Sequence, residues 1–259
     1  MNYPVIDPVL IHIGPVQLRW YGLMYVFGFV FAYIIVSKIS RHRGYDLNRN
    51  EIEDLLTYCI IGLIVGARLG YCFFYNFGFY IANPLKIFAV WEGGMSFHGG
   101  LIGLILAGWL YSNKKQKPFL MLADLGAIAA TPGLFFGRIG NFINAELYGR
   151  VTDMPWGMVF PGAGSLPRHP SQIYEAFFEG IVLFLVLYII HLKSRTKGIL
   201  IASFLICYGA MRFILEFFRQ PDPQLGFVFS GITMGQILSA VMVIAGTVLM
   251  FYRLKSIRT

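Results

Sequence analysis

Seven long apolar runs recur along this chain of 259 residues and constrain its fold more than any other feature. A helix crosses the bilayer core with about 20 apolar residues. The chain is 57% hydrophobic and 13% charged, whereas soluble domains carry about 25% charged residues. We therefore expect an all-α polytopic membrane protein with about seven transmembrane helices, formed as a single integral membrane domain over residues 1–259. The runs cover residues 20–37, 52–75, 97–111, 119–136, 173–191, 199–218 and 232–252.

Glycines modify two of these runs. The second run contains Gly62, Gly66 and Gly70 at intervals of four, a smooth stripe against which another helix can pack closely. The third run is short and is interrupted by Gly99, Gly100 and Gly103, which favours a broken or partly re-entrant segment.

Cations gather in alternate connections between the runs, and cytoplasmic loops carry the excess of Lys and Arg. The pattern predicts an external N-terminus, an internal C-terminus and a small outer-face cap over residues 138–172, between spans four and five. Met1 to Leu18 contain no Lys or Arg, so we expect the first span to be retained rather than cleaved as a signal peptide. Thirteen of the 21 cations lie in these connections: Lys38, Arg41, Arg43, Arg49, Lys114, Lys115, Lys117, Lys193, Arg195, Lys197, Arg253, Lys255 and Arg258.

Three arginines, Arg68, Arg138 and Arg212, lie within spans or at their outer ends. A charge inside a span costs about 2.5–3.5 kcal/mol, so a chain that keeps such residues usually uses them. Tyr208, Arg212 and Glu216 are four apart and share one helix face. This face fits either a self-neutralising Arg212–Glu216 ion pair or a cation presented to a ligand and oriented by Glu216.

Two further arginines have other interpretations. Arg68 points away from the glycine stripe of its helix, and both structural pairing with a carboxylate of another helix and contact with a substrate remain open. Arg219 lies near the face of Arg212 but close to the helix end, so we expect it to cap the helix or to extend toward the membrane interface.

The densest polar segment is Gly137-Arg-Ile-Gly-Asn-Phe-Ile-Asn-Ala-Glu-Leu-Tyr-Gly-Arg150. The guanidinium of Arg138 suits two phosphate oxygens, and one helical turn would bring the amides of Asn141 and Asn144 to the same side. The alternative is a polar turn that closes a membrane helix. The segment matches neither a dinucleotide fingerprint nor a P-loop.

Two histidines are further candidates. His98 lies at the outer end of the third run among glycines and can accept a proton near neutral pH, although a structural role is the alternative. His169 is a weaker candidate beside Ser171, a possible N-cap of the fifth helix. Cys59, Cys72 and Cys207 lie in apolar runs, so we expect neither a disulfide nor a metal site.

Several motifs together resemble the prolipoprotein diacylglyceryl transferases of bacteria. The segment from Gly137 to Arg150 resembles the signature of that family, and the resemblance extends in order from the first span to the last. The other matching segments are Trp20-Tyr-Gly-Leu-Met24, Met95-Ser-Phe-His-Gly-Gly100, Arg168-His-Pro-Ser-Gln172, Tyr208-Gly-Ala-Met-Arg-Phe213 and Glu216-Phe-Phe-Arg-Gln-Pro-Asp222.

The resemblance implies an enzyme of the bacterial inner membrane whose active site faces the outer leaflet. Such an enzyme moves the diacylglyceryl group of phosphatidylglycerol to the lipobox cysteine of a preprolipoprotein, and glycerol phosphate leaves. The implied partners are phosphatidylglycerol, the preprolipoprotein signal peptide and membrane lipid. Neither a nucleic acid nor a cofactor is expected.

The resemblance also assigns roles to residues. Arg138 and Arg212 would hold the lipid phosphate, and His98 would either deprotonate the thiol or only orient the headgroup. The expected substrate-binding residues are Tyr21, Asn141, Asn144, Glu146, Gly149, Tyr208 and Glu216, with the two glutamates holding arginines and Gly149 keeping the backbone close to substrate.

Two other functional classes, a transporter and a structural subunit, would also retain buried arginines. A transporter for an anionic solute would also use buried arginines, but it usually shows repeats with paired broken helices and a midplane site. A structural subunit would need Arg138 and Arg212 for assembly alone.

Overall fold

The computed structural model describes residues 1–14, 16–221, 226–229 and 231–258. Asp222, at the end of the last motif above, lies outside this range. The chain forms two compact units, one from Met1–Lys38 and Asp124–Thr259 and the other from Ile39–Ala123. Two long helices, α1 (Trp20–Arg43) and α5 (Phe119–Ile143), lie mainly in the first unit and extend into the second.

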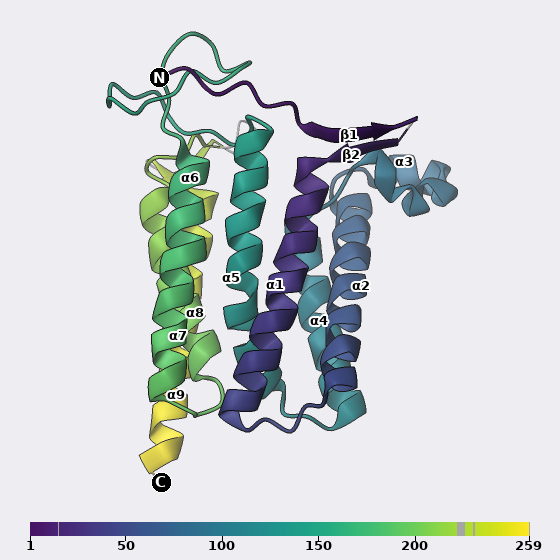
Figure 1. Cartoon of the computed structure of the whole chain (residues 1–259), viewed down its shortest axis with the longest axis vertical. Helices are drawn as coiled ribbons and strands as arrows, with labels where there is room; N and C mark the ends of the chain where they lie inside the picture. Colours follow the sequence, from purple (N-terminus) through teal and green to yellow (C-terminus); the bar gives the residue numbers. More distant parts are fainter. Residues whose placement is uncertain (15, 222–225, 230, 259) are drawn as a thin grey trace. The chain divides into compact units, whose positions relative to one another are not determined.

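The first unit contains the helices that lead to and from the cap (Figure 1). Gly28 of α1 lies so close to α5 that an added Cβ would be 3.2 Å from the Cα of Gly133. Its remaining elements are β1 (Val9–Ile13), β2 (Val16–Arg19), α6 (Ser171–Glu175), η3 (Ala176–Val182), α7 (Leu183–Lys193), α8 (Ile199–Leu215), β3 (Phe227–Phe229), β4 (Ile232–Thr233) and α9 (Met234–Arg258).

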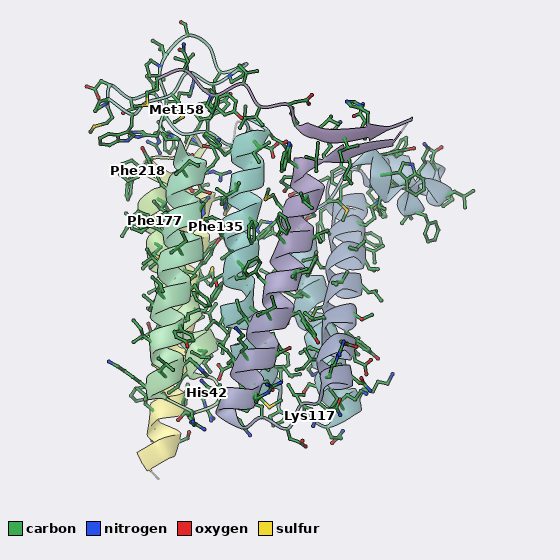
Figure 2. All side chains as sticks on the ribbon, in the orientation of Figure 1. His42, Lys117, Phe135, Met158, Phe177 and Phe218 are labelled. Carbon is green, nitrogen blue, oxygen red and sulfur yellow. The ribbon has the colours of Figure 1, made fainter. Side chains whose placement is uncertain are left out.

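The second unit is built on α2 (Arg49–Phe74) and α4 (Phe97–Lys115), which pack side by side (Figure 1). A capping box starts α2, because Asn48 and Glu51 each accept a hydrogen bond from the other's backbone N–H. Three short helices connect α2 to α4: α3 (Phe77–Ala82), η1 (Pro84–Phe88) and η2 (Val90–Glu92). Figure 2 shows His42 and Lys117 at one end of this unit.

The helical class expected from the apolar runs is confirmed. Among the described residues, five helical segments are long and apolar enough to cross a membrane: α1, α2, α5, α9 and the continuous segment Ser171–Lys193. The apolar helix α8 is shorter, at 17 residues, and α4 has 19. The count of seven spans and their orientation therefore stay predictions.

The third run is an unbroken helix, so the expectation of a broken segment is wrong, whereas a re-entrant placement stays a prediction. Its glycines serve helix packing instead. A Cβ added at Gly99 would lie 2.9 Å from the Cα of Gly70, and one at Gly103 would lie 2.9 Å from the Cα of Gly66. The glycines of α4 thus meet the stripe predicted on α2, and the two backbones approach without side chains between them.

The cap expected after α5 consists of turns. Because α5 continues to Ile143, residues 138–143 of the expected cap are helical. Residues 144–170 contain no helix, and isolated β-bridges join Gly149 to Arg219 and Arg168 to both Val151 and Met158. Figure 2 shows Met158 and Phe218 at this end of the first unit and Phe135 and Phe177 further along its helices.

Two small antiparallel ribbons, β1–β2 and β3–β4, had not been expected from the sequence. In the first, Val9 pairs with Arg19 and Ile11 with Leu18, and Gly14 adopts a positive φ of 59° at the turn. The ribbon ends where α1 begins, at Trp20.

Candidate active site

A buried cluster of arginines and glutamates lies in the first unit. The Nε of Arg138, on α5, is 2.7 Å from Oε2 of Glu175, on α6. The Nη1 of Arg212, on α8, is 3.4 Å from Oε1 of the same carboxylate. Glu175 therefore bridges the two arginines that the sequence analysis had assigned to phosphate binding.

A second carboxylate extends this cluster. Glu179, on η3, has its oxygens 3.7 Å from Nη2 of Arg138 and 3.9 Å from Nη1 of Arg212. The side chains of Glu175 and Glu179 are 1% and 0% exposed, whereas those of Arg138 and Arg212 are 18% and 14% exposed. The guanidinium groups are thus the more exposed part of the cluster, and the buried carboxylates form ion pairs with them.

The ion pairs around Glu175 and Glu179 are 3.4–3.9 Å long, apart from the 2.7 Å contact between Arg138 and Glu175. Within the described part of the chain, the four carboxylate oxygens lie near arginine nitrogens but form no hydrogen bond of good geometry. Charged groups gain most from short, aligned hydrogen bonds. Within the described residues, the buried Nη1 of Arg212 likewise forms no hydrogen bond.

Glu216 forms an ion pair with Arg212, the contact that both alternatives for this face require. Its Oε2 lies 2.7 Å from Nη2 of Arg212, and its Oε1 accepts a hydrogen bond of 3.0 Å from the Thr233 hydroxyl. Gly235 leaves room for this carboxylate, because an added Cβ would lie 2.8 Å from it. The pair is not self-contained, since Arg212 also faces Glu175 and Glu179.

Arg219 belongs to the same cluster, so the expectation that it caps a helix or extends to the interface is wrong. It is buried, and its Nη1 is 3.6 Å from Oε1 of Glu175. Its backbone forms a β-bridge with Gly149, and its carbonyl accepts a hydrogen bond of 2.9 Å from Nε of Arg150. The chain therefore turns back under the cap at this residue.

The continuous helical segment Ser171–Lys193 contains a π-helix, η3, between α6 and α7. Such segments widen the helical turn and often mark functional sites. Here Gly180 follows Glu179, and a Cβ at Gly180 would lie 2.6 Å from Cβ of Phe135 on α5. The widened segment thus brings Glu179 close to α5 and to Arg138.

The polar segment after α5 forms a tight loop. Oε1 of Glu146 accepts hydrogen bonds from the amides of Asn141 (2.7 Å) and Asn144 (3.3 Å), so both amides lie on one side as expected. Glu146 had been expected to hold an arginine. Among the described residues its side-chain partners are these amides instead, because the loop turns its side chain back toward α5.

This loop has an unusual backbone. Ala145 and Leu147, on either side of Glu146, have positive φ values of 54° and 56°, which costs about 1–3 kcal/mol for each residue. Three contacts fix the loop: Gln172 Nε2 donates to the Glu146 carbonyl (2.6 Å), Ser171 Oγ donates to the Leu147 carbonyl (3.1 Å), and the Glu146 N–H donates to Asn141 (3.0 Å). Ser171 is thus the first residue of α6 and not its N-cap.

Two tyrosines and a glycine complete the predicted set in this unit. The ring of Tyr21 lies against Gly140, where an added Cβ would be 2.8 Å away. The ring of Tyr208 stacks on Phe204 with centroids 5.3 Å apart, one turn before Arg212. A Cβ at Gly149 would lie 2.7 Å from the carbonyl of His169, so the structure requires glycine there for packing of the cap. Contact of Gly149 with substrate stays a prediction.

His169 lies in the cap, with its Nδ1 3.2 Å from the Tyr174 hydroxyl and its ring centroid 5.3 Å from that of Phe218. Burial lowers the pKa of its imidazole below the ordinary value of 6.5, and Asp153 offsets part of the shift. The neutral ring is therefore favoured, in keeping with a structural role.

His98 belongs to the second unit. It lies in the first turn of α4, after the N-cap Ser96, and is exposed with its ring 5.6 Å from that of Phe97. An exposed imidazole at a helix start can reach a substrate.

Arg68, also in the second unit, is buried and donates hydrogen bonds to five backbone carbonyls between Lys86 and Gly94. It is structurally paired, but with carbonyl oxygens and not with the carboxylate that had been considered.

Sequence reasoning missed Glu175 and Glu179. Both carboxylates lie in an apolar run, four residues apart, which is the same signal that had singled out Arg212 and Glu216. The cysteines Cys59, Cys72 and Cys207 are free. Across the described ranges, no group of three or more His, Cys, Asp or Glu side chains is arranged to hold a metal ion.

These features define a class: an integral membrane protein of apolar helices with a buried cluster of three arginines and three glutamates beside a capped end. A family model described as prolipoprotein diacylglyceryl transferase matches residues 8–252. The chain belongs to this family.

Relatives in the family are similar over nearly the whole chain. A phosphatidylglycerol–prolipoprotein diacylglyceryl transferase of Geobacter sulfurreducens is 52% identical over 246 residues, covering 95% of both chains. The protein of the same name from Photobacterium profundum is 50% identical and covers 99% of this chain and 96% of its own. That from Coxiella burnetii is 51% identical over 95% of both chains.

Proposed function

We propose that this protein transfers the sn-1,2-diacylglyceryl group of phosphatidylglycerol to the lipobox cysteine thiol of a preprolipoprotein. The bond between the glycerol carbon of the diacylglyceryl group and its phosphate oxygen breaks, a carbon–sulfur bond forms, and glycerol phosphate departs. This is the first step of bacterial lipoprotein maturation. The names of relatives about 50% identical over nearly the whole chain support it.

The observation that carries the proposal is the pair Arg138 and Arg212, held on one buried carboxylate. In this mechanism the two guanidinium groups bind the phosphate and stabilise the charge that develops as it becomes a leaving group. Preorganisation matters because the donors need not reorient during the reaction. Glu175, Glu179 and Glu216 keep them in place.

The thiol must lose its proton, because the thiolate is the nucleophile. In the proposal, His98 accepts this proton. Its exposure at the start of α4 supports this role. The proton then leaves on the released phosphate or in solvent, so charge and atoms balance.

The remaining roles are assigned by position. Asn141 and Asn144 bind the glycerol hydroxyls or phosphate oxygens, and Glu146 holds their amides in place. Tyr21 and Tyr208 line the headgroup region, and Gly149 allows the cap to pack closely. The lipobox segment of the signal peptide binds beside the lipid.

We place the enzyme in the inner membrane with seven spans, the N-terminus and the cap outside, and the C-terminus inside. The cation-rich connections support this orientation. The reaction then takes place in the outer leaflet, where acyl chains can extend sideways into lipid.

The decisive experiment combines purified protein, phosphatidylglycerol and a lipobox peptide, and measures the thioether product by mass spectrometry. Arg138→Lys and Arg212→Lys keep the charge but lose the two-pronged donor geometry, and each should lower kcat/KM by about 10²–10³-fold. Arg49→Lys, at an exposed surface pair, should retain full turnover. A folded protein that makes no thioether but moves an anion across vesicles would contradict the proposal.

A further inference from the structure

Arg68 lies on the membrane helix α2 but has no donor left for a ligand. The residue is 4% exposed, and a guanidinium carries five N–H donors. Every one of them is used by a backbone carbonyl of the same segment. The acceptors are the carbonyls of Ile87 (2.8 Å from Nε), Gly93 and Gly94 (2.6 and 3.1 Å from Nη1) and Lys86 and Ala89 (2.6 and 3.1 Å from Nη2).

The segment held by Arg68 has little regular structure of its own. It comprises the short helices η1 and η2 and the turn that follows them, and Gly93 and Gly94 both adopt positive φ. The guanidinium also lies 5.1 Å from the centre of the Tyr80 ring, a cation–π contact with α3. One side chain therefore fixes residues 80–94 against α2.

Ala67, the residue before Arg68 on α2, continues the attachment toward α4. Its carbonyl accepts a hydrogen bond of 2.9 Å from the N–H of Ser96. Ser96 in turn caps α4 by accepting from the N–H of Gly99 at 3.2 Å. Gly99 packs against Gly70, because a Cβ added at Gly70 would lie 2.7 Å from the Cα of Gly99.

These contacts fix the backbone on both sides of His98 in the sequence. The residues before it are held by Arg68 and Ala67, and the residue after it by the glycine stripe of α2. Within the described residues the imidazole itself forms no hydrogen bond, and its ring lies against that of Phe97. The position of the ring is therefore set by its backbone.

We propose that Arg68 is a positioning residue for His98: by saturating five carbonyls of residues 86–94, it fixes the start of α4 and thus the place of the imidazole. The inference rests on the proposed function, in which His98 accepts the thiol proton. Arg68 does not touch the lipid phosphate. Its charge matters because a buried cation can bind many carbonyl dipoles at once.

The test is a double-mutant cycle of Arg68→Lys and His98→Asn in the full-length protein, with phosphatidylglycerol and a lipobox peptide as substrates. Lysine keeps the charge but has three donors on one atom. A misplacement of about 1 Å can cost about 10²-fold in rate, so Arg68→Lys should lower kcat on that scale and leave KM for phosphatidylglycerol nearly unchanged. The double variant should be no slower than His98→Asn alone.

Multiplicative losses in the double variant would overturn the inference, because independent sites add in free energy. A raised KM for the lipid with unchanged kcat would also overturn it, since that pattern belongs to a phosphate contact. A wild-type protein that makes no thioether would instead overturn the proposed function. If the wild type is active and the losses caused by Arg68→Lys and His98→Asn are independent, this inference is overturned and the proposed function stands.

A second measurement separates positioning from misfolding. Hydrogen exchange in Arg68→Lys should increase over residues 84–98 and stay unchanged in α9. If Arg68→Lys does not fold, Tyr80→Leu removes the cation–π contact and enters the same cycle. The matched control is Arg43→Lys, a buried arginine over the Tyr45 ring (5.4 Å) outside this segment, which should retain wild-type kcat. Unchanged exchange in both Arg68→Lys and Tyr80→Leu would contradict the inference.

Discussion

At the scale of single residues, the cluster depends on Glu175, because Arg138, Arg212 and Arg219 all lie within 4 Å of its carboxylate. Three guanidinium groups that share one buried anion repel one another once that anion is removed. Breaking a buried ion pair from one side costs about 3–5 kcal/mol. The carboxylate therefore contributes both to stability and to the geometry of the proposed phosphate site.

We expect Glu175→Gln to lower the free energy of unfolding by about 3 kcal/mol and to reduce turnover as the arginines move apart. Thermal unfolding in detergent and the thioether assay measure the two effects. Glu53→Gln, at an exposed pair with Arg49, provides the control and should change stability by less than about 0.5 kcal/mol. Wild-type turnover in Glu175→Gln would contradict the assigned role.

His169 predicts a pH dependence of stability. Because burial lowers the pKa of its imidazole, the folded protein favours the neutral ring. The contribution of this residue to stability is complete above the ordinary value of 6.5 and is lost as pH falls through the lower value of the folded state. The Tm of wild type should therefore fall more steeply than that of His169→Gln between pH 7.5 and 5. Parallel curves would show that His169 does not carry this dependence.

Several site residues could be predicted from the sequence because a single charge in an apolar run is conspicuous. Arg138, Arg212 and the Arg212–Glu216 face are of this kind. The partner of a charge is harder to predict, because it is set by which helices are neighbours. For that reason the role of Glu175 was not predicted, and Arg219 was predicted to lie outside the cluster. The predicted partner of Glu146 was an arginine, whereas the structure shows two asparagine amides.

At the scale of elements, α2 and α4 depend on backbone contact between glycines. A Cβ at Gly103 would overlap the carbonyl of Gly62 and lie 2.9 Å from the Cα of Gly66. The sequence predicted the stripe on α2, but the glycines of α4 suggested a break. A glycine in a helix can indicate either flexibility or close packing. The two can be told apart only when the position of the neighbouring helix is known.

Gly103→Ala should push α4 away from α2 and destabilise the protein by about 1–3 kcal/mol, the usual cost of overpacking. Gly126→Ala is the matched control, because an added Cβ at that helical position meets nothing within 4 Å. The control should be neutral or slightly stabilising. Thermal unfolding of both variants gives the comparison, and equal melting temperatures would show that the stripe is not tightly packed.

At the scale of the whole molecule, composition and the spacing of apolar runs were enough to predict a helical membrane protein. They did not predict the two ribbons or the fold of the cap, because short strands and turns are fixed by contacts distant in sequence. Met1 and Tyr3, for example, bond to Gly157 and Val159 in the cap.

The proposed orientation can be tested by cysteine labelling of cells with a membrane-impermeant reagent. Ser165→Cys, exposed in the cap, should react from outside, whereas Asn113→Cys, exposed near the end of α4, should react only after permeabilisation. The parent protein, with Cys59, Cys72 and Cys207 unchanged, provides the background. Labelling of residue 113 in intact cells would contradict an external N-terminus.

The π-helix within the segment Ser171–Lys193 has a consequence for how homologous chains can differ in length. A wide turn holds one residue more than an α-helical turn, so it behaves as a single-residue insertion between Glu175 and Leu183. Deleting one residue there would rotate everything that follows by about 100°. The buried face of α7, formed by Leu183, Leu187 and His191, would then turn toward lipid. The added residue of the π-helix thus determines which face of α7 is buried. The segment should tolerate substitution at residues 176–182 more readily than a change in the number of residues there.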